Sequence, residues 1–189
     1  AKHSPHLEVF RQQGVEVLLL SDRIDEWLVG NLPEFAGKSM QSVAKGALDL
    51  GKLEDKDSAE EIKKAEEQYK GLLERMKKVL GDRVKEVRIS HRLTQSPACL
   101  VVEEHDVGAS LRNLLKAAGH DIPKVVPILE INPGHSLVTR LNDEQDEQRF
   151  GDWASILFDQ SLLAEGGQLE DPAAFVRRLN DGLLLLSAG

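Results

Sequence analysis

The clearest pattern in the chain is a pair of amphipathic segments close to its carboxy-terminal end. Apolar side chains recur at helical spacing over residues 144–165, and a second apolar stripe runs over residues 171–186. Gly166 and Gly167 separate the two stripes, and Asp171 followed by proline is a typical helix start. The pattern predicts a hairpin of two helices.

This hairpin carries more apolar surface than two helices cover by packing on each other. Burying one large apolar side chain is worth roughly 1.5 to 3 kcal/mol, so leaving five or six in water would forfeit about 10 kcal/mol. A second copy related by a two-fold axis would close a four-helix bundle, whereas the alternative is packing on the chain's own preceding residues. We expect the dimer, with an interface made of Phe150, Trp153, Leu157, Phe175, Val176, Leu179, Leu183 and Leu186.

The first part of the chain has the pattern of an incomplete α/β unit. Residues 5–13 predict a short helix ended by Gly14, and residues 15–20 (VEVLLL) predict a strand buried on both faces. Ser21 is expected to cap a further helix, and the best neighbouring strand candidate is residues 40–43. Because a buried strand needs neighbours, we interpret residues 1–45 as the end of a larger α/β domain.

The rest of the chain predicts a small α+β domain. Residues 46–57 are polar and contain glycine, as in a linker, and the domain follows over residues 58–189. It opens with a long amphipathic helix that Gly81 ends. Three strand candidates come next, and Pro127 predicts that the last lies at an edge or bulge. These strands are expected at residues 84–90, 98–102 and 125–131.

Charge and composition exclude several classes of function. The chain has 32 acidic and 24 basic residues, a net charge of -8, and no concentrated basic patch, so we expect no nucleic-acid partner. It has no apolar run of membrane-spanning length and no signal peptide, so we expect no membrane partner and a cytoplasmic location. The single cysteine, Cys99, lies in an apolar run and is expected to be a core residue.

The sequence offers no strong catalytic motif. It contains no glycine-rich phosphate loop, nucleophile elbow or paired-cysteine zinc pattern, and we predict no catalytic residue and no metal site. The oxygen and imidazole groups of residues 103–106 could ligate a metal, but a polar loop in which Asp106 caps the next helix is favoured. An enzyme with a site at His105 and Asp106 is the rival hypothesis, which a stoichiometric bound metal would revive.

A further apolar stripe covers residues 107–118. Most such stripes face a core, although this one could instead offer an apolar surface to a partner, as could Trp27 on its short helix. Its apolar positions include Val107, Leu111, Leu114 and Leu115.

Four longer segments resemble one known family. SPHLEVFRQQGVEVLLLSDRIDEWL, GDRVKEVRISHRL, ILEINPGHSLVTRL and LEDPAAFVRRLN are similar to the C-terminal part of the bacterial ninety-kilodalton heat-shock chaperones, and the similarity covers nearly the whole chain. The resemblance implies that residues up to about Lys45 end the family's middle domain. The remainder would be the C-terminal dimerisation domain, which ends in a helical hairpin.

The resemblance also implies a function. Members of this family are ATP-driven homodimeric clamps joined by a bundle of their last two helices, and they bind unfolded or partly folded client proteins, in some cases with cochaperones. Their client surface matches Glu26 and Trp27 and the exposed form of the stripe at Val107, Leu111, Leu114 and Leu115. ATP and Mg²⁺ bind an N-terminal domain that this chain lacks, so no cofactor is expected here. A purely structural dimerisation module without client contact is the alternative. Gly182, inside the last helix, departs from good helix-forming sequence.

Overall fold

The computed structural model describes residues 2–20, 22, 24–46, 56–104, 106, 119 and 125–187, and only the backbone at residues 26, 56–62, 186 and 187. Helices and short strands follow one another along this part of the chain, which agrees with the α+β class. The first elements are η1 (Pro5–Leu7), α1 (Glu8–Gln12), α2 (Asp25–Asn31), β1 (Glu34–Phe35) and β2 (Lys38–Ser39). The later ones are α3 (Lys56–Leu80), η3 (Gly81–Arg83), β3 (Val87–Ile89), β4 (Ala98–Val101), β5 (Ile128–Ile131), α5 (Ser136–Asp143), α6 (Glu147–Ala164) and α7 (Pro172–Ser187).

The three longer strands form a mixed sheet in the order β3-β5-β4. Strand β5 pairs parallel with β3 and antiparallel with β4, so it is the central strand. The prediction that Pro127 places this strand at an edge or bulge is therefore wrong. Pro127 precedes the strand, and its carbonyl accepts a hydrogen bond from the Lys85 N–H at 2.7 Å. The missing proline N–H thus falls outside the ladder that it would have interrupted.

The two faces of this sheet differ in chemistry because successive strand residues point to opposite sides. One face is apolar and packs under α3, α5 and α6 in the main hydrophobic core. From the strands this core takes Val87, Ile89, Ala98, Leu100, Leu129 and Ile131, and from the helices it takes residues that include Met76, Val138, Phe150 and Leu157. The opposite face carries Arg88, Cys99 and Glu130, which are neighbours across the strands.

The predicted C-terminal hairpin is present, and Asp171 caps its second helix as predicted. The Asp146 carboxylate accepts from the Arg149 N–H at 2.9 Å at the start of α6, and the Asp171 carboxylate accepts from the Ala174 N–H at 2.9 Å at the start of α7. Gly166 ends α6 with φ at 74°, a left-handed conformation that glycine adopts without strain. Helix α6 covers β4, whereas α7 packs on α6.

Two strand predictions in the first part of the chain are wrong. Residues 15–20 form no strand, and Leu18 is 80% exposed instead of buried on both faces. Residues 40–43 are also not a strand, because the short hairpin of β1 and β2 ends just before them. An apolar run forms a strand only beside another strand, and none pairs with residues 15–20 in the described part of the chain.

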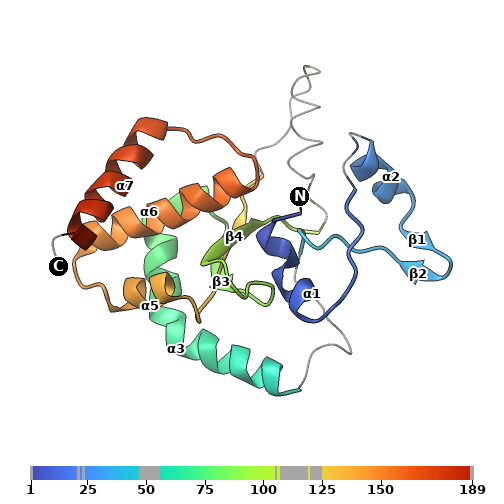
Figure 1. Cartoon of the computed structure of the whole chain (residues 1–189), viewed down its shortest axis with the longest axis horizontal. Coiled ribbons are helices and arrows are strands. Elements are labelled where there is room, and N and C mark those ends of the chain that lie inside the picture. The colour runs from blue at the N-terminus through green and yellow to red at the C-terminus, as the bar shows by residue number, and fades with distance from the viewer. Residues whose placement is uncertain are drawn as a thin grey trace.

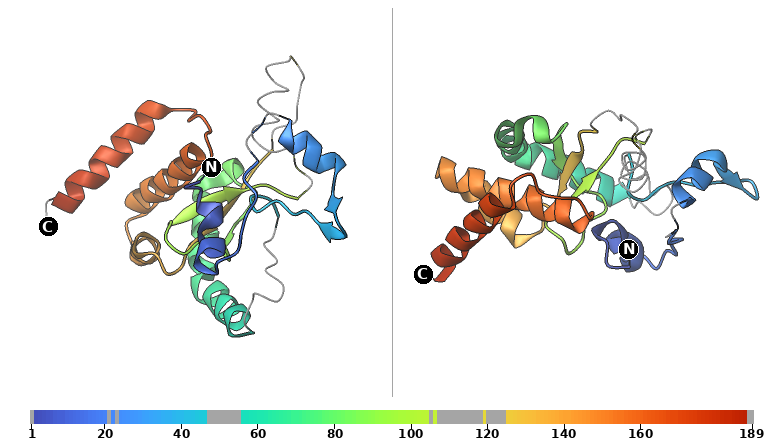
Figure 2. Two further views of the ribbon diagram at one scale, coloured as in Figure 1. Left: turned by 45° about the vertical axis from the view of Figure 1, so that its right-hand side comes forward. Right: turned by 90° about the horizontal axis from the view of Figure 1, so that it is seen from above.

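The elements lie along an elongated body. Helix α2 and the β1–β2 hairpin project at one end, α7 lies at the other, and the mixed sheet with α3, α5 and α6 lies between them (Figure 1). Both views of Figure 2 show the same separation of α2 from α7. Two elements that could contact partners are therefore far apart on one chain.

Candidate functional site

Helix α7 leaves a row of large apolar side chains on the surface. Val176 and Leu183 lie two turns apart on the same side of the helix and are 52% and 55% exposed. Leu184 and Leu185 in the next positions are 67% and 54% exposed. Burial of these side chains would be favourable, so α7 offers an apolar surface that the chain itself does not cover.

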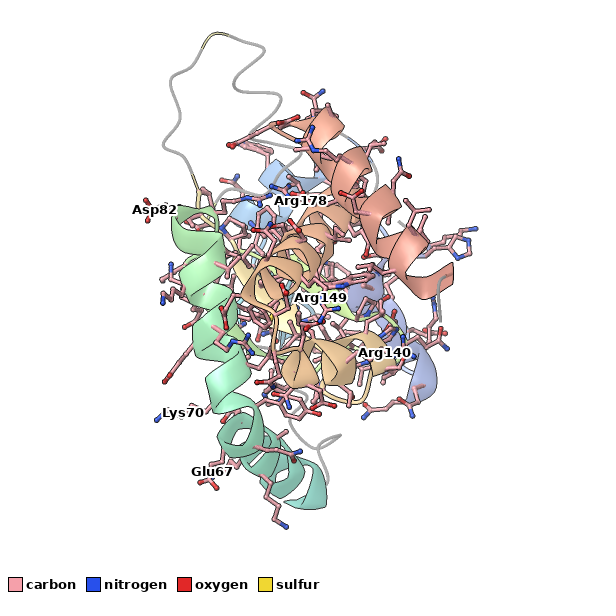
Figure 3. All side chains as sticks on the ribbon, turned by 90° about the vertical axis from the view of Figure 1, so that its left-hand side faces the viewer. Glu67, Lys70, Asp82, Arg140, Arg149 and Arg178 are labelled. Carbon is pink, nitrogen blue, oxygen red and sulfur yellow. The ribbon has the colours of Figure 1, made fainter. Side chains whose placement is uncertain are left out.

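Beside this row lies a groove between α5, α6 and α7, with a volume of about 190 Å³. Its lining is mainly apolar and includes Leu137, Leu141, Trp153, Leu157 and Leu185, with Gly182 in the wall that α7 forms. Arg140, Glu144 and Arg149 also line it, and Arg140 and Arg149 follow Arg178 down the face that Figure 3 shows. The groove is therefore mainly apolar, and its charged lining includes the ion pair of Arg149 with Glu144 at 3.0 Å.

The structure separates the eight predicted interface residues into groups. Val176 and Leu183 are exposed, and Trp153, Phe175 and Leu179 are partly buried. Phe150 and Leu157 need correction, because they are 0% and 2% exposed and belong to the chain's own core. Packing on the preceding residues thus accounts for the inner face of α6, although not for the outer face of α7. The Leu186 side chain lies outside the described residues.

A second apolar surface surrounds α2. Trp27 is 62% exposed, Ile24 is 67% exposed and Leu28 is 42% exposed, and Phe35 of the adjoining hairpin is 70% exposed. Glu26 lies in the same helix, but its side chain is not described. The predicted residues Val107, Leu111, Leu114 and Leu115 lie outside the described residues altogether. Among the predicted client-binding residues, Trp27 is therefore the one whose side chain the structure describes.

The face of the sheet opposite the main core carries the small apolar cluster of Cys99, Val101 and Ile128, and it also holds a buried ionic network centred on Glu130. Its carboxylate accepts from Arg92 Nε at 2.8 Å, from Arg88 Nη2 at 2.8 Å and from the Ser90 hydroxyl at 2.9 Å. Glu130 is 2% exposed and Arg92 is 0% exposed. Both arginines also donate to the Gly46 carbonyl, at 2.8 Å from Arg92 and 3.2 Å from Arg88. The network therefore attaches the backbone at Gly46 to the sheet.

Hydrogen bonds to the Glu8 carboxylate join helix α1 to the loop between β3 and β4. Glu8 accepts hydrogen bonds from the backbone N–H groups of Thr94 at 2.8 Å, Gln95 at 2.7 Å and Ser96 at 3.0 Å, and from the Ser96 hydroxyl. Burial alone would raise the pKa of Glu8, but these hydrogen bonds together outweigh it and lower the pKa below its ordinary value. Glu8 thus holds the loop between β3 and β4 as an anion.

The residue pair His6 and Glu165 adds a contact between η1 and the end of α6. His6 Nε2 lies 2.9 Å from Glu165 Oε1, but the geometry does not align a donor hydrogen with the oxygen, so this is a contact of polar groups rather than a hydrogen bond. His6 is 3% exposed. The start of the chain therefore packs on the helical hairpin as well as on the sheet.

Metal-ligating side chains are scattered over the described residues. No cluster of three metal-ligating side chains occurs among them, and no helix in this part of the chain is long and apolar enough to cross a bilayer. Cys99 is 1% exposed, and burial, followed by the nearby Glu130 charge, raises the pKa of its thiol. In the described region, the features suited to a function are the apolar surfaces at the two ends.

The sequence analysis missed the polar contacts that join the first part of the chain to the sheet. Glu8 and the loop that it holds are 86 to 88 residues apart, and Arg92 and Glu130 are 38 residues apart. Arg88 lies beside Glu130 because of the register between β3 and β5, which the sequence alone does not give. A charged residue inside an apolar strand pattern, as in ILEI at residues 128–131, is the one signal that was available.

Comparison with known proteins identifies relatives over the whole chain. It is 61% identical over 187 residues to the chaperone protein HtpG of Nitrosococcus oceani and 62% identical over 191 residues to that of Aromatoleum aromaticum. These matches cover 99% and 100% of this chain but only 30% and 29% of the relatives. HtpG of Chromobacterium violaceum is 61% identical over 187 residues, which are 99% of this chain and 30% of that protein.

The chain thus spans about 30% of the length of these relatives and matches one region of them. The family model described as Hsp90 protein matches residues 1–187. This confirms the resemblance on which the sequence analysis relied. The chain belongs to the Hsp90 protein family.

Proposed function

We propose that this chain is the homodimerisation and client-binding region of an ATP-dependent molecular chaperone. Membership of the Hsp90 family and identity to HtpG chaperones support the general assignment. In this proposal the chain acts through apolar contacts and catalyses no reaction itself. ATP and Mg²⁺ would bind elsewhere in the longer protein, which would act in the cytoplasm.

The exposed apolar row of α7 is the single observation that carries the dimerisation part. Residues Val176, Leu183, Leu184 and Leu185 remain more than half exposed even though the neighbouring core is closely packed. A second copy of α7 related by a two-fold axis would cover the same row on both chains at once. The proposed interface comprises Trp153, Phe175, Val176, Leu179, Leu183 and Leu186.

The exposed surface around Trp27 supports the client-binding part. Large aromatic side chains with exposed apolar neighbours are typical of protein-binding surfaces, and non-native polypeptides present complementary apolar segments. We include Glu26, Val107, Leu111, Leu114 and Leu115 in this surface. Because α2 and α7 lie at opposite ends of the chain, a dimer joined at α7 would hold two client surfaces and raise the effective concentration for a second contact.

The client-binding part is tested by suppression of aggregation. A chemically denatured model protein is diluted into buffer with the wild-type chain, with Trp27→Ser, or with Leu114→Ser combined with Leu115→Ser. Both variants should suppress aggregation less than the wild type while keeping the wild-type dimer mass. Val79→Ser is the matched control, because Val79 is a 40% exposed apolar residue on α3, outside the proposed surfaces.

The alternative is a structural dimerisation module that makes no client contact. It predicts that the Trp27 and Leu114/Leu115 variants suppress aggregation as well as the wild-type chain does. It also predicts the wild-type mass for all variants, so the aggregation assay alone separates the two functions. Binding of cochaperones is a further property that we propose for the longer protein.

A further inference from the structure

Gly182 occupies an unusual position inside α7. Glycine disfavours the interior of a helix relative to alanine, and this one is buried rather than placed at a helix end. A Cβ atom at this position would lie 3.2 Å from both Cζ2 and Cη2 of Trp153. The edge of the indole ring therefore rests on the backbone of α7, and the lack of a side chain at Gly182 provides the room for it.

The same two residues shape the groove beside the exposed row. Trp153 and Gly182 both line it, and Leu185 lies one turn further along α7 in the same lining. Leu183, which immediately follows the glycine, points to the surface and is 55% exposed. The distance between indole and glycine thus sets how far α7 stands from α6, and with it the width of the groove and the position of the exposed leucines.

We propose that Trp153 and Gly182 are positioning residues for self-association, and that the groove that they define receives an apolar side chain from α7 of a second copy of this chain. The inference rests on the proposed dimerisation. The occupant follows from continuity, because the groove adjoins the exposed row of Val176, Leu183 and Leu185. A two-fold axis then places the row of each copy against the groove of the other.

The substitution Gly182→Ala tests this proposal, because two physical effects oppose each other. Alanine raises the intrinsic helix propensity of α7, which by itself would favour a well-formed hairpin and an unchanged or tighter dimer. The added methyl group also meets the indole ring at 3.2 Å, closer than ordinary van der Waals contact, and moves α7 away from α6. If positioning dominates, the dimer dissociation constant should rise about 10-fold, a change of about 1.4 kcal/mol.

Gly71→Ala is the matched control. Gly71 also lies inside a helix, α3, but a Cβ there would meet nothing within 4 Å. This variant gains helix propensity without a steric contact, so its dimer dissociation constant should equal that of the wild type. Helix content from circular dichroism confirms that each variant is folded, and sedimentation equilibrium gives the dissociation constants.

The double variant Gly182→Ala with Trp153→Leu identifies the contact partner. Trp153→Leu removes the ring that the new methyl group would meet and adds no atom to α7. It should weaken the dimer by itself, because it also removes part of the apolar lining of the groove. Adding Gly182→Ala to it should then cause no further loss, so the two substitutions are strongly non-additive, which general destabilisation would not produce.

Three outcomes would overturn part of this account, and they are distinguishable. A wild-type chain that stays monomeric at tens of micromolar, roughly the range of a modest interface, refutes the proposed dimerisation itself. A dimeric wild type with an equally tight Gly182→Ala dimer refutes the positioning role alone. A Gly182→Ala loss of the same size with and without Trp153 shows that the indole is not the partner, which also refutes the positioning role.

Discussion

Replacing Val176 and Leu183 together with serine should dissociate the proposed dimer. Full burial of such a side chain is worth roughly 1.5 to 3 kcal/mol, and a little more than half of each side chain is still exposed in the single chain. Covering that remainder is worth about 1 kcal/mol for each side chain. A two-fold interface contains each residue twice, so the double variant loses about 4 kcal/mol per dimer. At 1.4 kcal/mol per factor of ten, the dissociation constant rises about a thousandfold.

Sedimentation equilibrium over a range of concentrations measures this change directly. Leu18→Ser is the matched control, because Leu18 is 80% exposed but lies between α1 and α2 in the sequence and is no part of α7. The control should keep the wild-type dissociation constant, and all three proteins should give the same far-ultraviolet circular dichroism. Equal dissociation constants for the wild type and the Val176/Leu183 variant would refute the reasoning, because the exposed row of α7 would then contribute nothing to self-association.

Glu8, Glu130 and Cys99, which lie away from α7, give three further predictions. Glu8→Gln should lower the free energy of unfolding at neutral pH by about 1 kcal/mol, because Glu8 accepts several hydrogen bonds but is largely screened by solvent. The folded-state pKa of Glu8 is lowered, so its contribution is present above the unfolded-state pKa and is lost as the pH falls through the folded-state value. Thermal melts at several pH values should therefore show a weaker loss of stability in acid for the variant than for the wild type. Glu130→Ala should cost about 3 to 5 kcal/mol in urea unfolding, because it leaves the fully buried Arg92 without its carboxylate; a loss below 1 kcal/mol would contradict this. Cys99 should react with a thiol reagent only after denaturation, since it is buried and its thiol pKa is raised; rapid reaction of the native chain would count against the described core.

The elements that could be predicted from the sequence are those whose pattern is local. Helices α3, α6 and α7 carry long apolar stripes, and side chains cap the starts of α6 and α7, so the existence of these helices follows from local sequence. The strand expected at residues 15–20 is absent because strand formation depends on a neighbour, which periodicity does not reveal. The position of β5 was misjudged for a similar reason, because Pro127 disrupts a ladder only where that ladder extends to it.

The candidate site was predictable to a similar extent. The apolar row of α7 followed from composition, since Val176 and Leu183 belong to a stripe that one neighbouring helix cannot cover. The burial of Phe150 and Leu157 did not follow, because α6 has apolar residues on more than one face and only the fold decides which face meets the sheet. The packing of Trp153 on Gly182 could not be predicted either, because the sequence indicates only that a glycine lowers the helix propensity of this segment.

The anchoring of the first part of the chain has a consequence for how small an autonomous unit can be. If the residues before α3 were removed, the backbone N–H groups of residues 94–96 would lose the Glu8 carboxylate as their acceptor. Arg88 and Arg92 would lose the Gly46 carbonyl. These donors could then be satisfied only by water, so the loop and the sheet surface would open locally more often. The sheet and its helices are therefore fully stable only when the residues from Glu8 to Gly46 are bound to them. A protease that cleaves the chain between Gly46 and α3 should leave two fragments that remain associated.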